Sequence, residues 1–407
     1  MRRHVSSLAC LIAALAASFT AGATGQTRRT VAIRVRETAG IRRSAYPVNA
    51  RVPFERGALG DASHARLMIN GAEVPVQVSV ESAWPDGSVR SLAVDFNASV
   101  GPGEETTAQL EYGDGVNAEA VGRGLSVTET PEAIQVGNVR FNTAPSPLLL
   151  SAKYRQEDIG QGLNGFALLD AAGASHDASD ADGLKAEVIR RGPLYVVIKY
   201  SGRVSVGDTR APFTVLAEMP NSKTWVKVTT TIEDPGRRVR EISFHTPLAF
   251  GAFPRTWDFG TGSWSYGFLR SATERATLTQ IAGPATPTSS TSASPGAASW
   301  QIRSGAKGQE AVAERSNGAR PAIAEGWGHI QDAKEAIAFA IGGFGEQAGT
   351  YTISVDGDGQ MSYRFAPAQP QTRLSLTVYQ HFVATPVPVG AVTSPVAMLH
   401  PLVAAVQ

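Results

Sequence analysis

The stretch Val74–Phe96 reads VPVQVSVESAWPDGSVRSLAVDF and contains two runs of alternating apolar and polar residues around one turn. Every second residue is apolar in the first run, Val74–Val80, and again in the second run, Leu92–Phe96. A period of two is typical of half-buried β-strands. Between the runs, Trp84–Gly87 contains a proline that fixes φ and a glycine that accepts a positive φ, as a tight turn requires. The stretch therefore predicts two strands joined by a hairpin turn.

The same period recurs through most of the chain, and long amphipathic helices are scarce. Further strands are predicted at Val31–Val35, Leu194–Tyr200, Val226–Ile232, Ile337–Ile341, Tyr351–Val355, Met361–Phe365 and Leu374–Val383. The turn residues Asp356–Gly359 predict another hairpin. We therefore expect an all-β protein, with 43% hydrophobic residues available to form large cores.

Two changes in composition predict how this chain is divided. Turn-forming residues between Gly113 and Gly124 interrupt the alternation, which places a boundary between a small domain over residues 24–118 and a larger one over residues 119–407. The segment Ile281–Ser299 is rich in Pro, Ser, Thr, Ala and Gly and has too few large apolar groups to form a core. Because similar strands lie on both sides of it, we interpret it as a loop within one β-sandwich. A true interdomain linker is the alternative.

The N-terminus is typical of a secretory signal peptide over residues 1–23. The basic residues at positions 2–4 precede an uncharged apolar run, Leu8–Ala17, and Ala21–Ala23 offers small residues for cleavage. The run is shorter than the roughly 20 residues of a membrane-spanning helix, so cleavage is favoured over an anchor. We expect a secreted or periplasmic protein that begins near Thr24 and has no membrane span in its mature form.

Charge and cysteine content exclude several classes of function. The whole chain has a formal charge of +1, and loss of the two arginines of the leader changes it to about −1. Strong binding to nucleic acids or anionic membranes depends on a surplus of Lys and Arg, so neither is expected. The single cysteine, Cys10, lies in the leader. Disulfides and thiolate chemistry are therefore excluded from the exported protein.

Four short segments together resemble the secreted exo-rhamnogalacturonan lyase-like family. They are VPFERG at Val52–Gly57, WPDGSVR at Trp84–Arg90, EDPGRRVREI at Glu233–Ile242 and GWGH at Gly326–His329. The resemblance implies an N-terminal RIFT-barrel domain, a following β-sandwich and a carbohydrate ligand. In that family a helical toroid follows the sandwich and is the expected place for catalysis, whereas this sequence ends at Gln407. The resemblance therefore implies a fold and a ligand class more than a reaction.

Strand phase indicates where a ligand would bind. In Trp225–Thr231 the residues Val226, Val228 and Thr230 share one face, which leaves Trp225 and Lys227 on the other. The same argument for Leu374–Val383 places Tyr379 and His381 together on a polar face. Trp225 could stack on a sugar ring while Lys227 meets the carboxylate of an acidic sugar, and Trp327 is a further candidate contact. The alternative is that these aromatic residues pack against loops or the first domain, which is their commoner role.

The candidates for proton transfer are His329, Tyr379 and His381. β-Elimination from a uronate needs a base near C5 and an acid at the leaving oxygen, and Tyr and His can fill those roles. No pair of histidines has the spacing of a metal site, so no cofactor is expected. Calcium is a weaker hypothesis that rests on Asp177, Asp180 and Asp182, whose spacing does not match the helix–loop–helix calcium motif. These aspartates are more readily explained as a solvated turn.

Other reactions have less support in the sequence. Ser263–Gly267 approaches a serine-hydrolase motif but lacks its first glycine and a strand-to-helix elbow. No phosphate loop or dinucleotide fingerprint occurs, and glycosidase chemistry needs paired carboxylates that sequence alone does not identify. The leading hypothesis is therefore binding of an acidic polysaccharide or its fragments without catalysis. The alternatives are a polysaccharide lyase or other carbohydrate-active enzyme with its site on the sandwich face, and a structural or assembly module.

Overall fold

The structure is a computed structural model that describes residues 28–143, 150–154, 157–221, 225–282, 298–316, 321–384 and 392–407. Nearly all the secondary structure in these ranges is antiparallel β-strand, which confirms the predicted all-β fold. None of the helices in this part of the chain is long and apolar enough to cross a membrane. The predicted leader and residues 283–297 lie outside the described residues, so the expectations for them stay predictions.

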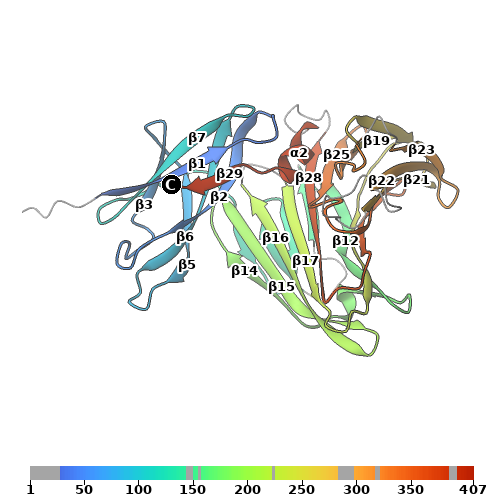
Figure 1. Cartoon of the computed structure of the whole chain (residues 1–407), viewed down its shortest axis with the longest axis horizontal. Coiled ribbons are helices and arrows are strands. Elements are labelled where there is room, and N and C mark those ends of the chain that lie inside the picture. Colours follow the sequence, from blue (N-terminus) through green and yellow to red (C-terminus); the bar gives the residue numbers. More distant parts are fainter. Residues whose placement is uncertain are drawn as a thin grey trace, which may run out of the picture.

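The first strands form an N-terminal unit of two sheets around a shared core (Figure 1). Within the described residues, one sheet has the order β29–β1–β7–β3–β4, with β1 at Arg29–Arg36, β3 at Ala65–Ile69, β4 at Ala72–Val74, β7 at Glu105–Tyr112 and β29 at Val403–Val406. The other has the order β2–β6–β5, with β2 at Arg43–Pro53, β5 at Val76–Ala83 and β6 at Val89–Val100. Their inward residues, such as Val35, Val52 and Phe96, are almost completely buried. The RIFT-barrel topology implied by the family resemblance stays a prediction.

The stretch Val74–Phe96 forms the expected hairpin. Strands β5 and β6 pair antiparallel, and the turn between them closes with a hydrogen bond of 2.9 Å from the Gly87 N–H to the Trp84 carbonyl. Gly87 has a φ of +85°, which a residue with a side chain rarely adopts. Asp86 accepts a hydrogen bond from the Ser88 N–H at 3.1 Å. The conspicuous WPDG motif is therefore a turn in which the aspartate binds the backbone.

The remaining strands form a β-sandwich, as predicted. One sheet runs in the order β14–β15–β16–β17–β28–β25–β24–β19–β20 in the described part of the chain. Its strands are β14 (Asp182–Arg190), β15 (Tyr195–Val206), β16 (Thr209–Pro220), β17 (Trp225–Glu233), β19 (Arg255–Gly260), β20 (Trp264–Leu269), β24 (Trp327–Gln331), β25 (Glu335–Ile341) and β28 (Arg373–Ala384). We call this the site sheet. Its inner face packs on the second sheet, for example through Phe339 and Tyr363, whose ring centroids are 6.0 Å apart.

The second sheet of the sandwich has the order β23–β22–β21–β26–β27–β18–β12–β11–β10–β9–β8 within the described ranges, and β13 pairs with β12. Its strands are β8 (Val127–Glu129), β9 (Ala133–Val136), β10 (Val139–Asn142), β11 (Leu150–Tyr154), β12 (Glu157–Asp170), β13 (Ser175–Asp177), β18 (Val239–Pro247), β21 (Glu274–Ala282), β22 (Ser299–Ala306), β23 (Ala311–Arg315), β26 (Gly349–Asp356) and β27 (Gln360–Pro367). A short 3₁₀ helix, η1 (Ala178–Asp180), follows β13. Ile281 pairs with Ser299 across β21 and β22, so both flanks of the low-complexity segment are neighbours in one sheet.

Three features join the N-terminal unit to the sandwich. The chain returns after β28 through the short helix α2 (Ser394–Leu399) and ends in β29, which pairs with β1 (Figure 1). The side chain of Gln77 crosses the junction, where its amide nitrogen donates to the Tyr195 carbonyl and its oxygen accepts from the N–H groups of Leu194 and Tyr195, each at 2.9 Å. Residues 403–406 therefore belong to the first sheet of the N-terminal unit. The predicted domain boundary near residue 118 stays a prediction.

The third connection is a buried ion pair that holds the end of α2. Arg43 binds Glu37 at 3.0 Å, and both side chains are almost fully buried. Arg43 also donates to the carbonyls of Ala397 at 3.1 Å and His400 at 2.6 Å. A buried charge is tolerated when it is paired and its remaining hydrogen-bonding groups are satisfied, as they are here. The arrangement fixes α2 against β2 at the edge of the junction.

Candidate functional site

The six candidate site residues lie in two adjacent rows on the outer face of the site sheet. In strand order β17–β28–β25–β24, the first row is Trp225, His381, Ala338 and His329. The second row is Lys227, Tyr379, Ala340 and Trp327. The inner face carries Val226, Val228 and Val378, all buried in the sandwich core. Strand phase therefore predicted correctly that Trp225 shares a face with Lys227 and that Tyr379 shares a face with His381.

Helix α2 divides this face into two flanks. It contacts β25, β28 and β24, and the residues that β25 presents to it, Ala338 and Ala340, are small enough to admit a helix and have no exposed surface. Strands in a sheet are about 4.8 Å apart, so two strand steps separate His381 from His329 by about 10 Å. Trp225, Lys227, Tyr379 and His381 thus lie on one flank, and Trp327 and His329 lie further along the sheet. The six residues do not converge on one point.

The N-terminal unit covers the flank that carries Trp225. Trp225 is 8% exposed, and its ring packs edge-to-face on Tyr46 of β2, with a centroid distance of 5.6 Å and an interplanar angle of 63°. It belongs to the hydrophobic cluster of the N-terminal unit. The ring face is therefore used for packing, as the commoner role of such aromatic residues predicts, and is not open to stack on a sugar. Its indole nitrogen is buried and has no hydrogen-bond partner among the described residues.

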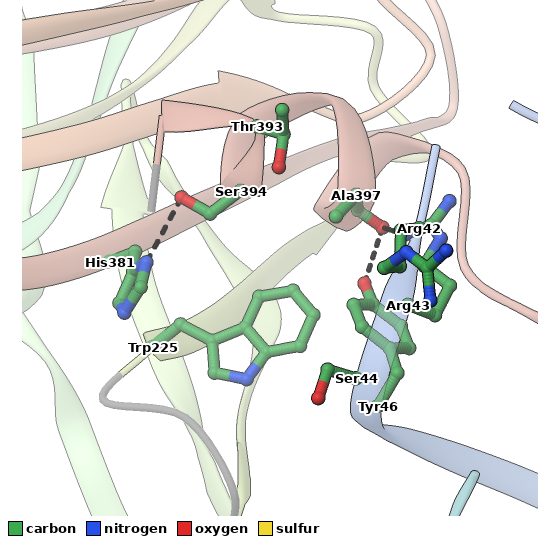
Figure 2. A pocket seen from close by; sticks show the side chains of 9 residues that line it. All are labelled: Arg42, Arg43, Ser44, Tyr46, Trp225, His381, Thr393, Ser394 and Ala397. Carbon is green, nitrogen blue, oxygen red and sulfur yellow. Dashed lines mark hydrogen bonds between the residues drawn. The ribbon is translucent and has the colours of Figure 1, made fainter. Parts of the chain in front are cut away.

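Two small cavities lie at this junction and share Tyr46 and Trp225 as walls. The first has a volume of about 80 Å³ and is also lined by Arg42, Ser44, His381 and Ser394 (Figure 2). The second has a volume of about 140 Å³ and is also lined by Asn49, Tyr195, Glu218, Lys227 and Tyr379. Together we call them the interdomain groove. Each is smaller than the roughly 300 Å³ at which pockets for drug-sized ligands begin, so the groove has room for part of a ligand.

In the second cavity, charges are already compensated. Lys227 lies 2.8 Å from Glu218, which also accepts a hydrogen bond of 2.8 Å from the Tyr195 hydroxyl. Burial opposes the charged form of Lys227, but the attraction of Glu218 outweighs it and the pKa of Lys227 is raised. Burial also raises the pKa of Tyr379. Both groups are therefore protonated at neutral pH: Tyr379 can donate a proton or hydrogen bond, and Lys227 has a carboxylate partner within the protein.

The wall of the first cavity includes Trp225, whose indole nitrogen is buried. The Trp225 Nε1 atom is buried and makes no hydrogen bond with any described residue. Figure 2 shows the indole ring between His381 and the β2 residues Ser44 and Tyr46. His381 is held by a hydrogen bond of 2.9 Å between its Nδ1 atom and the Ser394 hydroxyl at the start of α2. The cavity thus combines a fixed donor with hydroxyl groups and a histidine.

His329 has a partner that the sequence did not identify. Its Nδ1 atom lies 2.8 Å from Asp258 Oδ1, and its backbone N–H donates to the same oxygen at 3.0 Å. The Nε2 atom is buried and has no hydrogen-bond partner among the described residues. Trp327 packs edge-on against the imidazole at 5.9 Å. Asp258 therefore orients a histidine whose second nitrogen is unused, an arrangement that suits proton transfer.

The acidic turn near η1 gives no support to a metal site. Asp177 caps η1 by accepting from the Ser179 N–H at 2.7 Å, and Asp182 pairs with Arg210 at 3.2 Å. No cluster of three or more metal-ligating side chains occurs among the described residues. The near-match to a serine-hydrolase motif is also structural: Ser265 lies in β20 and its hydroxyl is 2.9 Å from that of Thr261.

Several groove residues were not predicted because they come from other parts of the chain. Tyr46 and Asn49 belong to the N-terminal unit, and their approach to β17 depends on domain packing that no local pattern encodes. Glu218 could in principle have been predicted from the sequence. It pairs with Lys227 across the β16–β17 hairpin, and the alternation in β16 places it on the same face as that lysine.

The chain matches no sequence-family model and no curated protein sequence. Among solved structures it is similar to a protein in the glycosyl hydrolase family 38 from Enterococcus faecalis, with a TM-score of 0.55, 11% identity, and coverage of 93% of this chain and 47% of that one. An alpha-mannosidase from the same organism gives a TM-score of 0.56, 11% identity, and coverage of 93% and 46%. The chain thus spans about half the length of these structures. At this identity the likeness establishes a shared all-β fold, found also in glycoside hydrolase structures, and assigns no reaction.

Proposed function

We propose that the protein binds carbohydrate, with part of an oligosaccharide seated in the interdomain groove, and that it does so without catalysis of its own. The observation that carries the proposal is the pair of adjoining cavities walled by Tyr46 and Trp225, with hydrogen-bonding groups on both sides. Sugar ligands need apolar surface for their ring faces and paired polar groups for their hydroxyls, and small-molecule sites commonly lie at domain interfaces. The similarity in fold to glycoside hydrolase structures and the family resemblance of the sequence support this ligand class.

The arrangement of the titratable groups favours binding over turnover. Tyr379 lines the second cavity, whereas His381 lines the first, so these two groups do not face one common position. The raised pKa of Tyr379 keeps its hydroxyl protonated, and Lys227 is neutralised by Glu218. A base and an acid placed on opposite sides of one sugar bond are required for elimination.

The test is calorimetric titration of the full chain with a panel of neutral and acidic oligosaccharides. Tyr379→Phe keeps the ring and removes one hydroxyl, and loss of one hydrogen bond worth about 1 kcal/mol predicts affinity about fivefold weaker. Tyr266→Phe is the matched control, because Tyr266 is 70% exposed on β20 and lies away from the groove. Absence of binding to every glycan, or equal effects of both changes, would reject the groove as a carbohydrate site.

A lyase or other carbohydrate-active enzyme is the second candidate, and the His329–Asp258 pair favours it. A buried imidazole held by a carboxylate, with its other nitrogen unused, has the geometry of an oriented base. Incubation with pectic glycans and absorbance in the unsaturated-uronate band tests this candidate. Growth of that absorbance, lost in His329→Gln and in Asp258→Asn, would establish elimination at this pair. Loss only in His381→Gln or Tyr379→Phe would place the reaction in the groove instead.

A further inference from the structure

The two cavities of the interdomain groove differ in charge. In the second cavity the lysine already has a carboxylate partner, Glu218, at 2.8 Å. In the first cavity, no acidic side chain is among the described residues that form the wall. Arg42 is one of the residues that line that wall, is exposed to solvent and makes no ion pair with any described residue. An anion would therefore encounter an uncompensated positive charge in the first cavity only.

The neighbouring arginine does not compete for the same ligand. Arg43 is neutralised by Glu37 and uses two further donors on backbone carbonyls at the end of α2. Its role is structural, because each interaction holds the C-terminal segment in place. The adjacent residue, Arg42, makes no such interactions in the described chain. Its side chain can therefore move toward a ligand without loss of any described contact.

Trp225 supplies a second, independent indication of a ligand. Trp225 lines this cavity and is more than nine-tenths buried, yet its indole nitrogen has no hydrogen-bond partner in the described chain. Buried polar atoms in native proteins are almost always satisfied, so an orphan of this kind requires an explanation. An indole N–H can donate but not accept, so its partner must present a lone pair. Tyr46 packs on the ring and holds the donor in position.

We propose that the first cavity is a carboxylate subsite, in which the Trp225 N–H and the Arg42 guanidinium bind the acidic group of a uronic-acid residue. This inference rests on the proposed carbohydrate function. A volume of about 80 Å³ suits a single small group of a sugar, and the rest of the ring would extend toward the second cavity, with which the first shares Tyr46 and Trp225. The preference for acidic sugars then comes from Arg42 and Trp225, and Lys227 is not its source.

The Trp225 indole N–H gives a direct readout. In a ¹⁵N-correlated spectrum of the full chain, its signal is identified by its absence from Trp225→Phe. Titration with sodium glucuronate should shift that signal, whereas the methyl ester of glucuronic acid, which has no charge, should not. Arg42→Gln should reduce the affinity for glucuronate about tenfold, as loss of a charge-assisted hydrogen bond predicts. Arg34→Gln, an exposed arginine on β1, is the control and should leave it unchanged.

The outcomes separate this inference from the proposed function. No shift of the indole signal, or an equal shift with the ester, would overturn the carboxylate subsite even if neutral glycans bind in calorimetry. Loss of glucuronate binding in Lys227→Met but not in Arg42→Gln would also overturn it and would place the anion in the second cavity. Binding of glucuronate at the indole without affinity for any oligosaccharide would instead reject the carbohydrate function and retain the subsite. Arg42 is exposed, so its variant is expected to fold even if Trp225→Phe does not.

Discussion

Replacement of Gln77 by leucine should show how much the junction between the N-terminal unit and the sandwich contributes to stability, apart from the two hydrophobic cores. Gln77 is buried and satisfies three backbone groups of the sandwich, the N–H groups of Leu194 and Tyr195 and the Tyr195 carbonyl. Leucine has a similar volume, so packing changes little, but all three groups lose their partner. A buried group left unsatisfied costs about 1–3 kcal/mol. Water can enter at a junction, so the lower end applies to each group, and we expect a loss of about 3 kcal/mol.

Urea unfolding of the full chain, followed by tryptophan fluorescence, measures this loss as a change in the free energy of unfolding. Gln109→Leu is the matched control, because Gln109 is exposed on β7 and its substitution should change stability by less than about 0.5 kcal/mol. The reasoning would be refuted if Gln77→Leu unfolded within that same margin of the wild type. Affinity for glycans should fall together with stability, since the groove is formed by the junction.

Three further predictions concern acid sensitivity, export and the low-complexity segment. Burial would raise the pKa of Glu37, but hydrogen bonds from Gly103, Ala39, Gly40 and Arg43 lower it to about 2. The stabilising effect of Glu37 is therefore complete above its ordinary pKa near 4.5 and is lost as pH falls toward 2. In Glu37→Gln, the melting temperature should depend less on pH in that interval than it does in the wild type. N-terminal sequencing of exported protein should begin near Thr24, and recovery of the intact leader in membranes would contradict export. Limited proteolysis should cut first within the Ile281–Ser299 segment and leave the fragments associated, because β21 and β22 pair on either side; release of separate stable fragments would disprove this.

Much of the fold was predictable because its determinants are local. Alternating residues defined the strands β15, β17, β25, β26, β27 and β28, and the turn chemistry of Trp84–Gly87 defined the hairpin of β5 and β6. The pairing of β29 with β1 was not predictable. Val403–Val406 is a short run with no special pattern, and its partner lies at the opposite end of the sequence. Local periodicity carries no information about such a distant partner.

The candidate site was predictable to the level of a sheet face. Strand phase placed Trp225 with Lys227 on one face and Tyr379 with His381 on another, because side chains alternate strictly along a strand; the pairing of β17 with β28 joins the two faces. It did not show what covers that face. Burial of Trp225 by Tyr46 depends on the packing of two units, and the separation of His381 from His329 depends on the order of β28, β25 and β24 in the sheet. Both are properties of the tertiary structure, which strand phase does not report. Trp225 therefore packs on Tyr46, although it was a candidate for stacking on a sugar.

The return of β29 to β1 has a consequence for biosynthesis. The register joins Ile33 to Val406, so the first sheet is completed by residues translated long after β1. The entropy of closing such a long loop is high, and contacts of this range form late in folding. During translation, β1 would expose an unpaired edge while the whole sandwich is made, and an unpaired strand edge is a site of aggregation. Strand β29 therefore protects β1, and a nascent chain in which β29 has not yet been made should depend on chaperones.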